Sequence, residues 1–488
     1  MNWLLAAASA LLLVLAFPPF DQAWLAAVAL APLLIALDRE WRAGRRFLLG
    51  YLSGVLFWGA TCHWIHFVLT VHGGLSAPLA WAAVVLFALI KGLHTGVFAW
   101  LAGAALASPW AALIVPALWV AIERTHAPLG FAWLALGNAG VEMDVPARAA
   151  PYAGVYGVSF LFAAMSSALA LVVLGRPRRR LAPVAVLAVL YLLPGPPSPE
   201  SGEQIAVLVQ PNISESAQWT EDWIARQHRR LEFLSEHTAR AGLPPRLIVW
   251  PEVPAPVYYD QDARFRELVN GLAKRTGAWL VLNAVPYDDD GAPRNSALLV
   301  SPAGEPAGRY DKMKLVPFGE YVPRPLGFLR KITSEAGDFV PGQRLVTLQA
   351  GDHRLGAFVC YEAVFPDLVR RFATAGAELL VNISNDGWYG RTAAREQHLK
   401  IARMRALENR RWLLRATNNG ITAAIDPAGR LVRRLPSYTE AAIAVTFSFR
   451  REVTPYARYG DWFVIACVLL AVAGLLAEQM PRYRVPRR

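Results

Sequence analysis

The sequence predicts a multispan bundle of membrane helices, followed by an α/β layered domain and one closing apolar helix. Three observations lead to this fold class. Hydrophobic residues make up 55% of the 488 residues and charged residues only 18%, which is too apolar for an ordinary soluble protein. The apolar residues are concentrated in 1–195 and again in 460–478. Within 204–450, short apolar runs alternate with longer mixed segments, which favours strands interleaved with helices.

The apolar parts of the chain predict eight membrane spans. A helix needs about 20 mostly apolar residues to cross the hydrocarbon, and four of the segments reach that length only with flanking residues. The expected spans are Trp3–Phe17, Trp24–Leu37, Phe47–Leu69, Ala80–Leu106, Trp110–Ile122, Gly154–Leu174, Leu181–Leu193 and Trp462–Leu476. The first lacks the basic leader of a secretory signal peptide, so we expect it to be retained. Residues 1–195 should therefore hold about seven helices.

Clusters of arginine predict the orientation of these spans, because basic residues gather on the cytoplasmic side. The clusters lie between spans two and three, between spans six and seven, and after span eight, at Arg39–Arg46, Arg176–Arg180 and Arg482–Arg488. With eight spans and both termini in the cytoplasm, all three clusters are cytoplasmic and residues 204–450 lie on the opposite face. The net charge of +12 is then largely orientation signal and indicates no nucleic-acid partner.

A few ionisable side chains fall within the predicted bundle. They are His63, His66, Lys91, His94, Glu123 and Arg124. Such groups are functional candidates by default, with transport as one role for Lys91 or His94. Several lie near span ends, where snorkelling to the interface is the plainer explanation.

The domain at 204–450 is expected to contain strands covered on both faces, because its apolar runs lack strict alternation. The expected strands are Ile205–Val209, Leu247–Trp250, Trp279–Val285, Ala297–Ser301, Leu355–Val359, Leu379–Ile383, Trp412–Ala416, Thr422–Ile425 and Ala441–Thr446. Edge strands such as Ala297–Ser301 are expected to form hairpins. The expected amphipathic helices are Asp222–Ala241, Asp262–Arg275 and Ala393–Asn409. A proline-rich hinge, Pro194–Pro199, joins this domain to the bundle.

Three reactive groups, expected at the carboxyl ends of strands, could share one cleft. Glu252 follows the strand at Leu247–Trp250, Lys312 follows Tyr310-Asp311, and Cys360 follows the strand at Leu355–Val359. A cysteine needs a base to become a thiolate, and a shielded carboxylate can act as that base. A lysine offers fixed positive charge for the oxyanion that forms when a thiolate attacks a carbonyl. The set therefore provides one residue for each role in acyl transfer.

Taken singly, each of these residues has a plainer structural interpretation. A lone cysteine in an apolar strand is usually a small core residue, and most glutamates and lysines are exposed surface charges. No metal site is predicted, because His228, His237, His353 and His398 show no paired spacing and Cys360 is the only cysteine of the domain. With Cys62 and Cys467 in spans, no disulfide framework is expected either.

Four motifs in one order carry a family resemblance. They are Trp-Pro-Glu at 250–252, Tyr-Asp-Lys at 310–312 with Pro-Phe-Gly-Glu at 317–320, Cys-Tyr-Glu at 360–362, and Asn-Ile-Ser-Asn-Asp-Gly-Trp at 382–388. The order resembles the nitrilase superfamily, and the layout over essentially the whole chain resembles its membrane-embedded branch, the apolipoprotein N-acyltransferases. This resemblance implies an α-β-β-α sandwich for the domain. It also implies the bacterial inner membrane, with the catalytic domain on the periplasmic side.

The resemblance also assigns roles to the three reactive side chains. Glu252 would be the general base, Lys312 the oxyanion stabiliser and Cys360 the nucleophile. Lys314 is the rival lysine, but the family places its lysine eight positions before the Pro-Phe-Gly-Glu glutamate, and 320 minus 312 is eight. Glu320 would support that lysine, with a purely structural salt bridge as the alternative.

Five further residues match site positions of the family. Tyr361 would offer its backbone N–H to the oxyanion, and Glu362 would be a further site carboxylate. Trp219, Asn295 and Trp388 fall at positions that resemble substrate-lining residues. For the two tryptophans, core packing is nearly as good an explanation.

The activity that the resemblance implies is a two-step acyl transfer without a cofactor. A phospholipid would donate an acyl chain to Cys360, and the α-amine of a diacylated apolipoprotein would accept it at the lipid bilayer. A membrane-tethered amidase that hydrolyses a carbon–nitrogen bond would use the same three residues, although it has little use for a multispan bundle. A transporter with a regulatory domain is the third reading, but it would need polar, broken helices at mid-depth. The loop Tyr321–Gly342, with Leu326 and Phe328 among prolines, is expected to form a mobile arm that touches the membrane.

Overall fold

The computed structural model describes residues 1–128, 131–199, 201–214, 219–252, 259–288, 290–322 and 339–479. The chain forms two compact units. The helical unit comprises Met1–His63, Trp81–Gly195 and Tyr459–Arg488, and the sheet unit comprises Trp64–Ala80 and Pro196–Arg458. A segment from the predicted third span and the loop after it therefore groups with the sheets.

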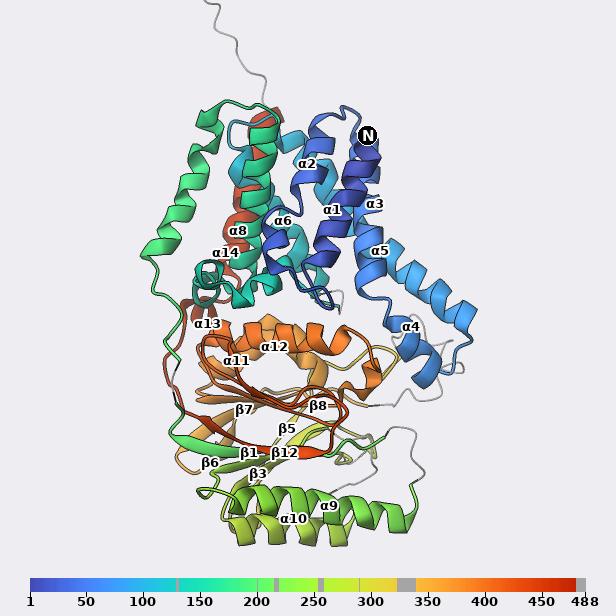
Figure 1. Cartoon of the computed structure of the whole chain (residues 1–488), viewed down its shortest axis with the longest axis vertical. Coiled ribbons are helices and arrows are strands. Elements are labelled where there is room, and N and C mark those ends of the chain that lie inside the picture. Colours follow the sequence, from blue (N-terminus) through green and yellow to red (C-terminus); the bar gives the residue numbers. More distant parts are fainter. Residues whose placement is uncertain are drawn as a thin grey trace, which may run out of the picture. The chain divides into compact units, whose positions relative to one another are not determined.

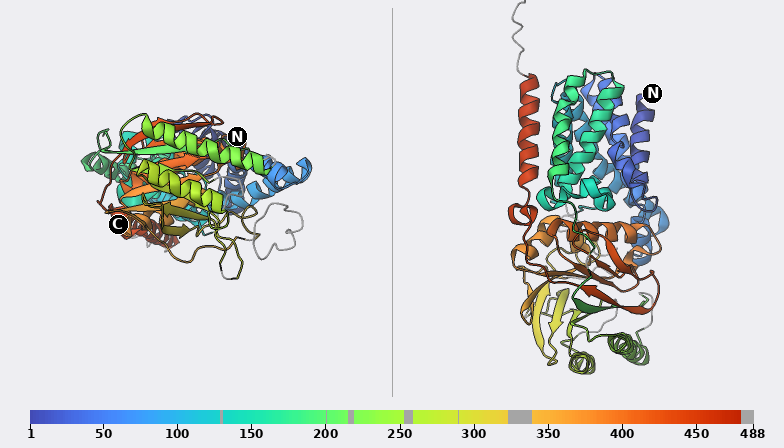
Figure 2. Two further views of the ribbon diagram at one scale, coloured as in Figure 1. Left: turned by 90° about the horizontal axis from the view of Figure 1, so that it is seen from below. Right: turned by 60° about the vertical axis from the view of Figure 1, so that its left-hand side comes forward.

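The helical unit is built from helices that are mostly apolar (Figures 1 and 2). These are α1 (Asn2–Leu15), η1 (Ala23–Ala27), α2 (Ala31–Asp38), α3 (Ala43–Thr61), α5 (Ala77–Ala105), α6 (Ala111–Glu123), η3 (Arg124–His126), η4 (Leu136–Glu142), α7 (Asp144–Ala147), α8 (Ala150–Val173), η5 (Arg178–Leu192) and α14 (Trp462–Gln479). In α5 the apolar side chains Leu86, Ile90 and Trp100 are exposed, as expected for a helix that faces lipid.

The number of helices that qualify as membrane spans is smaller than the eight segments predicted. Among the described residues, α5 and α8 are long and apolar enough to cross a membrane, and a third candidate joins α3 to Ile65–His72. Asn2–Leu15, Ala23–Asp38 and Trp462–Ala477 are shorter apolar helices. The count of eight thus stays a prediction, whereas a membrane protein with a few apolar spans is shown.

The predicted seventh span, Leu181–Leu193, takes an unexpected form. It lies in η5, a 3₁₀-helix over Arg178–Leu192 rather than an α-helix. A 3₁₀-helix rises about 2.0 Å per residue, so its 15 residues reach about 30 Å, whereas an α-helix of that length would reach about 22 Å. The tighter winding lets a short apolar segment extend further.

The sheet unit contains two six-stranded sheets. The first has the strand order β12-β1-β2-β3-β4-β5, with β1, β2 and β3 mutually parallel. Its strands are β1 (Gln204–Gln210), β2 (Leu247–Val249), β3 (Trp279–Ala284), β4 (Ser296–Val300), β5 (Pro306–Asp311) and β12 (Ala441–Phe447). The second has the order β11-β10-β9-β8-β7-β6, with β7, β8 and β9 parallel. Its strands are β6 (Leu348–Ala350), β7 (His353–Val359), β8 (Leu379–Ser384), β9 (Leu413–Thr417), β10 (Ala423–Ile425) and β11 (Leu431–Arg434).

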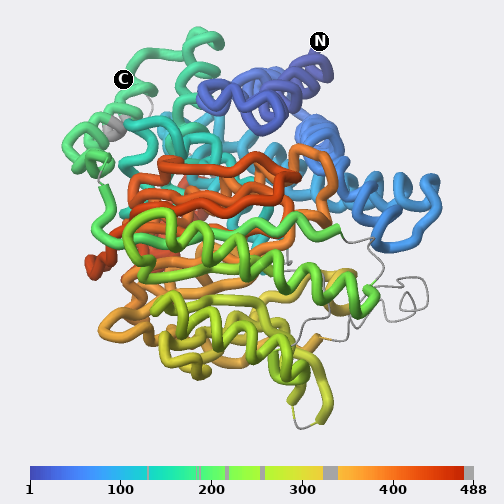
Figure 3. Tube along the Cα trace, turned by 60° about the horizontal axis from the view of Figure 1, so that its bottom comes forward, coloured from blue at the N-terminus to red at the C-terminus, as the bar shows by residue number. Residues whose placement is uncertain are grey.

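The two sheets pack face to face, and helices cover their outer faces. Helices α9 (Glu221–Arg240) and α10 (Ala263–Thr276) run side by side over the first sheet (Figure 3), while α11 (Pro366–Thr374) and α12 (Ala394–Asn409) cover the second (Figure 1). Apolar side chains from helix and sheet, such as Leu231, Val269 and Ile248, form the core beneath α9 and α10. The predicted α-β-β-α sandwich is confirmed.

The strands that the sequence did not predict are the weakly apolar ones. β5 forms the expected hairpin with β4, but β5 rather than β4 is the edge strand. β6 and β11 are the edges of the second sheet, and α11 is a short helix that was also not predicted. Most of the predicted arm at Tyr321–Gly342 lies outside the described residues.

Part of the sheet unit comes from the first hundred residues of the chain. The π-helical turn η2 (Val68–His72), which follows α4 (Ile65–Phe67), packs against η8 (Asp386–Tyr389). The rings of Trp64 and Tyr389 lie 5.1 Å apart, and those of His72 and Trp388 lie 4.4 Å apart. These aromatic contacts cover the turn that follows β8.

Candidate active site

Lys312 and Glu252 meet although they come from different strands of the first sheet. Glu252 lies just past β2, and Lys312 follows β5 directly. The Nζ atom of Lys312 lies 3.9 Å from Oε1 of Glu252 and donates a hydrogen bond of 2.9 Å to Glu320. The lysine side chain is only 1% exposed. The rival Lys314 is exposed, so its side chain does not occupy the buried position between the carboxylates.

Asn295 bridges the two carboxylates. Its Nδ2 atom donates to Oε1 of Glu252 and to Oε1 of Glu320, both at 2.7 Å, while its Oδ1 accepts from Asn283 at 2.8 Å. Since both donor hydrogens are used, the amide holds the two carboxylates at a fixed spacing. The interpretation of Asn295 as a substrate-lining residue stays a prediction.

Cys360 stands at the junction between β7 and the 3₁₀-turn η7 (Cys360–Val364). Its φ of 48° is in the left-handed region, which a residue with a Cβ adopts only when its surroundings hold it there. Burial, followed by the nearby charge of Glu252, raises the pKa of the Cys360 thiol to about 12, although Lys312 opposes the shift. The resting thiol is therefore protonated and needs a base to release its proton.

Burial and neighbouring charges together set the protonation of Glu252 and Lys312. Burial is the largest cause of the raised pKa of Glu252, and the charge of Glu320 adds to it, while Lys312 and the Asn295 amide oppose the rise. Burial alone would lower the pKa of Lys312, but the carboxylates of Glu320 and Glu252 outweigh it and raise the lysine pKa. A carboxylate with a raised pKa is a better base, and the lysine stays positively charged.

Glu362 connects the loop that begins at Lys312 (the lysine loop) to β7, the strand that ends just before Cys360 (the cysteine strand). Its Oε1 accepts from the Tyr310 hydroxyl at 2.7 Å and from the backbone N–H groups of Met313 and Lys314 at 2.7 and 3.1 Å. Its Oε2 accepts from the backbone N–H of Val359 at 2.9 Å. The side chain is fully buried. Its hydrogen bonds therefore connect the residues around Lys312 to Val359, the last residue of β7.

A second buried polar network lies behind Cys360, and sequence reasoning missed it. Asp386 accepts hydrogen bonds from Arg415 at 2.8 Å on both oxygens and from the Ser384 hydroxyl at 2.9 Å. His398 lies 3.1 Å from Asp386 through Nδ1 and 3.2 Å from the carbonyl oxygen of Cys360 through Nε2. Asp386 stands inside the motif at 382–388, which was a usable signal. From the sequence, His398 was considered only as a metal ligand, and it shows no paired spacing with another histidine.

The predicted aromatic and backbone positions are more dispersed. Trp219 packs against the core under α9, with its ring 4.9 Å from that of Trp223. Trp388 lies against His72, and Tyr361 is buried with its ring 5.4 Å from Phe365. The packing interpretation therefore accounts for the described contacts of Trp219.

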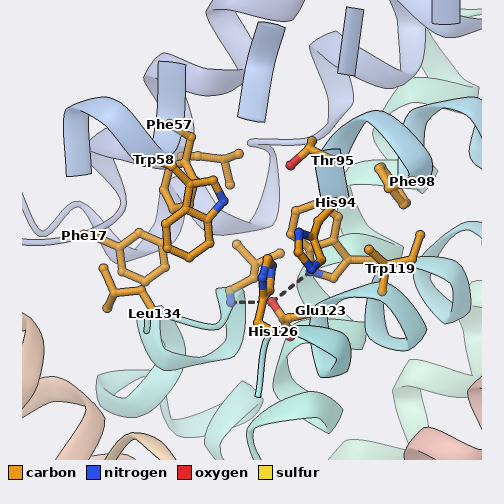
Figure 4. A pocket seen from close by; sticks show the side chains of 13 residues that line it. Phe17, Phe57, Trp58, His94, Thr95, Phe98, Trp119, Glu123, His126 and Leu134 are labelled. Atoms are coloured by element: carbon orange, nitrogen blue, oxygen red, sulfur yellow. Dashed lines mark hydrogen bonds between the residues drawn. The ribbon is translucent and has the colours of Figure 1, made fainter. Parts of the chain in front are cut away.

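The ionisable groups predicted within the bundle form local contacts. Oε1 of Glu123 accepts from Trp119 at 3.1 Å and from the backbone N–H of Leu136 at 2.7 Å (Figure 4). Lys91 bonds to His126 at 2.5 Å and to the carbonyl of Phe131 at 3.0 Å. The pocket beside Glu123 is a small cavity of about 40 Å³. These contacts fit a structural role better than a transport path.

Comparisons with known proteins cover nearly the whole chain. Residues 205–452 match the model of the carbon-nitrogen hydrolase family, and residues 9–168 match that of the apolipoprotein N-acyltransferase N-terminal domain. An apolipoprotein N-acyltransferase of Geobacter metallireducens is 36% identical over 98% of this chain and 95% of its own length. One of Azotobacter vinelandii is 33% identical over 99% and 96%. Among solved structures, an amidase from Nesterenkonia sp. covers 52% of this chain and 93% of its own, with 21% identity and a TM-score of 0.40.

Proposed function

The chain belongs to the apolipoprotein N-acyltransferase family, and we propose that it moves an acyl chain from a phospholipid to a lipoprotein through a thioester on Cys360. The observation that carries this proposal is the grouping of Glu252 and Lys312, which lie 3.9 Å apart. The charges of both act on the Cys360 thiol, since Glu252 raises its pKa and Lys312 lowers it. One base, one fixed cation and one thiol are the groups that acyl transfer through a thioester requires.

In the first half-reaction, Glu252 takes the thiol proton of Cys360 as sulfur attacks the ester carbonyl of the phospholipid. The oxyanion that forms is stabilised by Lys312 and by the backbone N–H of Tyr361. As the carbonyl re-forms, the ester C–O bond breaks, and Glu252 returns the proton to the departing lyso-phospholipid. The products are the thioester and an alcohol.

In the second half-reaction, the α-amine of the diacylglyceryl-cysteine at the lipoprotein N-terminus attacks the thioester. Glu252 takes a proton from the amine, the C–S bond breaks, and the Cys360 thiolate recovers the proton. The result is an amide on the lipoprotein and a free thiol. Glu320 and Asn295 support this cycle by holding Lys312 and Glu252 in place, while Trp219 and Trp388 are proposed to line the substrate path.

We further propose that both termini face the cytoplasm of the bacterial inner membrane and that the sheet unit lies on the periplasmic side. The arginine clusters of the sequence support this orientation. Labelling single introduced cysteines with a membrane-impermeant maleimide in spheroplasts tests it. A periplasmic sheet unit would react and a cytoplasmic one would not.

Intact-mass spectrometry tests the chemistry. Purified protein with a phospholipid should gain the mass of one acyl chain, and Cys360→Ala should not. A diacylated lipopeptide should then discharge the adduct into an N-acyl product. Absence of the adduct on the wild type would refute the proposal, and discharge to free fatty acid at the same rate with or without the lipopeptide would favour a hydrolase.

A further inference from the structure

His398 holds the peptide group that joins the nucleophile to the next residue. Its Nε2 lies 3.2 Å from the carbonyl oxygen of Cys360. A carbonyl oxygen only accepts hydrogen bonds, so Nε2 must carry the proton. Burial, followed by the charge of Arg415, lowers the pKa of His398, which favours the neutral ring. The other nitrogen, Nδ1, lies 3.0 Å from Nη2 of Arg415, a donor, and 3.1 Å from Oδ1 of Asp386, an acceptor. Whether or not Nδ1 carries a proton, Nε2 donates to the carbonyl of Cys360.

The carbonyl of Cys360 and the N–H of Tyr361 belong to the same peptide group. This bond is trans, so the C=O and the N–H point in opposite directions. Fixing the carbonyl against His398 therefore fixes the direction of the N–H on the other side. A hydrogen bond accepted by the carbonyl also polarises the peptide and makes its N–H a stronger donor.

We propose that His398 is a positioning residue that aims the Tyr361 N–H at the oxyanion formed during acyl transfer by Cys360. The inference rests on the proposed thioester chemistry. It needs a rigid His398, and the protein supplies one: the ring is fully buried against Asp386 and Arg415, which are fully buried as well. Cys360 itself has a φ of 48°, which a residue with a Cβ adopts only when its surroundings hold it there, and the peptide after it opens the 3₁₀-turn η7.

The test compares two substitutions that differ only in where they place an amide. The Nε2 of Gln can occupy the position of the histidine Nε2, whereas the shorter Asn reaches only the position of Nδ1. Single-turnover acylation of the full chain by phospholipid in mixed micelles is followed by intact mass. In parallel, peptide mapping follows alkylation of Cys360 by iodoacetamide. Alkylation displaces iodide from an sp³ carbon and forms no oxyanion, so it reports the thiol without the N–H.

We expect His398→Asn to slow acylation about 10- to 100-fold, less than the loss of a whole oxyanion donor, while alkylation changes less than about threefold. His398→Gln should acylate within about threefold of wild type. The matched control is His228→Asn, which replaces another buried histidine, on α9, whose ring packs against Phe265 of α10; it should leave both rates unchanged.

The outcomes separate the inference from the function beneath it. No acyl adduct on the wild type would refute the proposed function itself. With a normal wild type, His398→Asn acylating at the wild-type rate would overturn the positioning role. So would equal losses of acylation and alkylation, or a His398→Gln variant as slow as His398→Asn, since the loss would then reflect general damage to the site.

Discussion

Replacing Glu362 by Gln should separate the lysine loop from the cysteine strand. The glutamate accepts four hydrogen bonds, three through Oε1 from Tyr310, Met313 and Lys314 and one through Oε2 from Val359. Gln has one oxygen and one NH₂ group. Its best orientation keeps the oxygen toward the three donors, so its NH₂ faces the backbone N–H of Val359.

The size of the effect follows from that one contact. A fully buried N–H left without an acceptor costs about 1–3 kcal/mol. Val359 immediately precedes Cys360, and Met313 immediately follows Lys312, so the cost falls on the relative placement of nucleophile and cation. At about 1.4 kcal/mol per factor of ten, acylation should slow by about 5- to 150-fold.

Single-turnover formation of the acyl adduct, followed by intact mass, measures this rate. The matched control is Glu378→Gln, because Glu378 is also buried and also binds two partners, His353 and Arg451, away from the site. Wild-type acylation by Glu362→Gln would refute the reasoning. Equal slowing of both variants would refute it too, because the loss would then not depend on the link to Cys360.

Three further predictions concern the charges around the site. Glu252→Gln should abolish the adduct yet speed alkylation of Cys360 by iodoacetamide at about pH 9, since the carboxylate of Glu252 is one cause of the raised thiol pKa; slower alkylation would contradict this. Because Glu252 acts deprotonated and its pKa is raised, acylation should be lost as pH falls through a midpoint above 4.5. Asn295→Asp adds a carboxylate beside Glu252 and should move that midpoint upward. The pH dependence of the acylation rate, measured for both proteins, tests this, and an unchanged midpoint in the variant would contradict it. Arg415→Leu removes the buried cation that pairs with Asp386, so thermal unfolding should reveal a loss of about 3–5 kcal/mol, against about 0–1 for Arg434→Leu in an exposed pair.

The sequence predicted the central strands of the sheet unit because their residues are apolar on both faces. β7 and β8 are parallel neighbours covered by helices and by the other sheet, so their runs of Val, Ile and Leu are easy to recognise. The sequence of β5, Pro-Ala-Gly-Arg-Tyr-Asp, buries only Tyr310. An edge strand with Pro, Gly and charge carries little strand pattern, and only pairing with β4 reveals it.

The sequence could predict individual reactive residues of the site, but not the hydrogen-bond network that surrounds them. Strand ends indicated Glu252 and Cys360, and motif order selected Lys312. The partners of Asp386 could not be predicted in this way, because His398 is 12 positions away on a helix and Arg415 is 29 positions away on a strand. Such a network exists only after β8, α12 and β9 have packed together. Similarly, nothing in the sequence distinguishes a 3₁₀ winding at Leu181–Leu193 from an α-helix.

The aromatic cover on η8 has a consequence for biogenesis. Trp64 and Tyr389 touch across 325 positions of chain (389 minus 64), and Phe67 lies where a Cβ on Gly390 would come within 2.5 Å of its ring. The segment around Trp64 is therefore synthesised long before η8, and it can make these contacts only after most of the chain has been translated. A fragment cut at the proline-rich hinge would be an incomplete unit, with the turn after β8 stripped of the side chains that cover it. The hinge marks a boundary in composition, but it is not a boundary in folding.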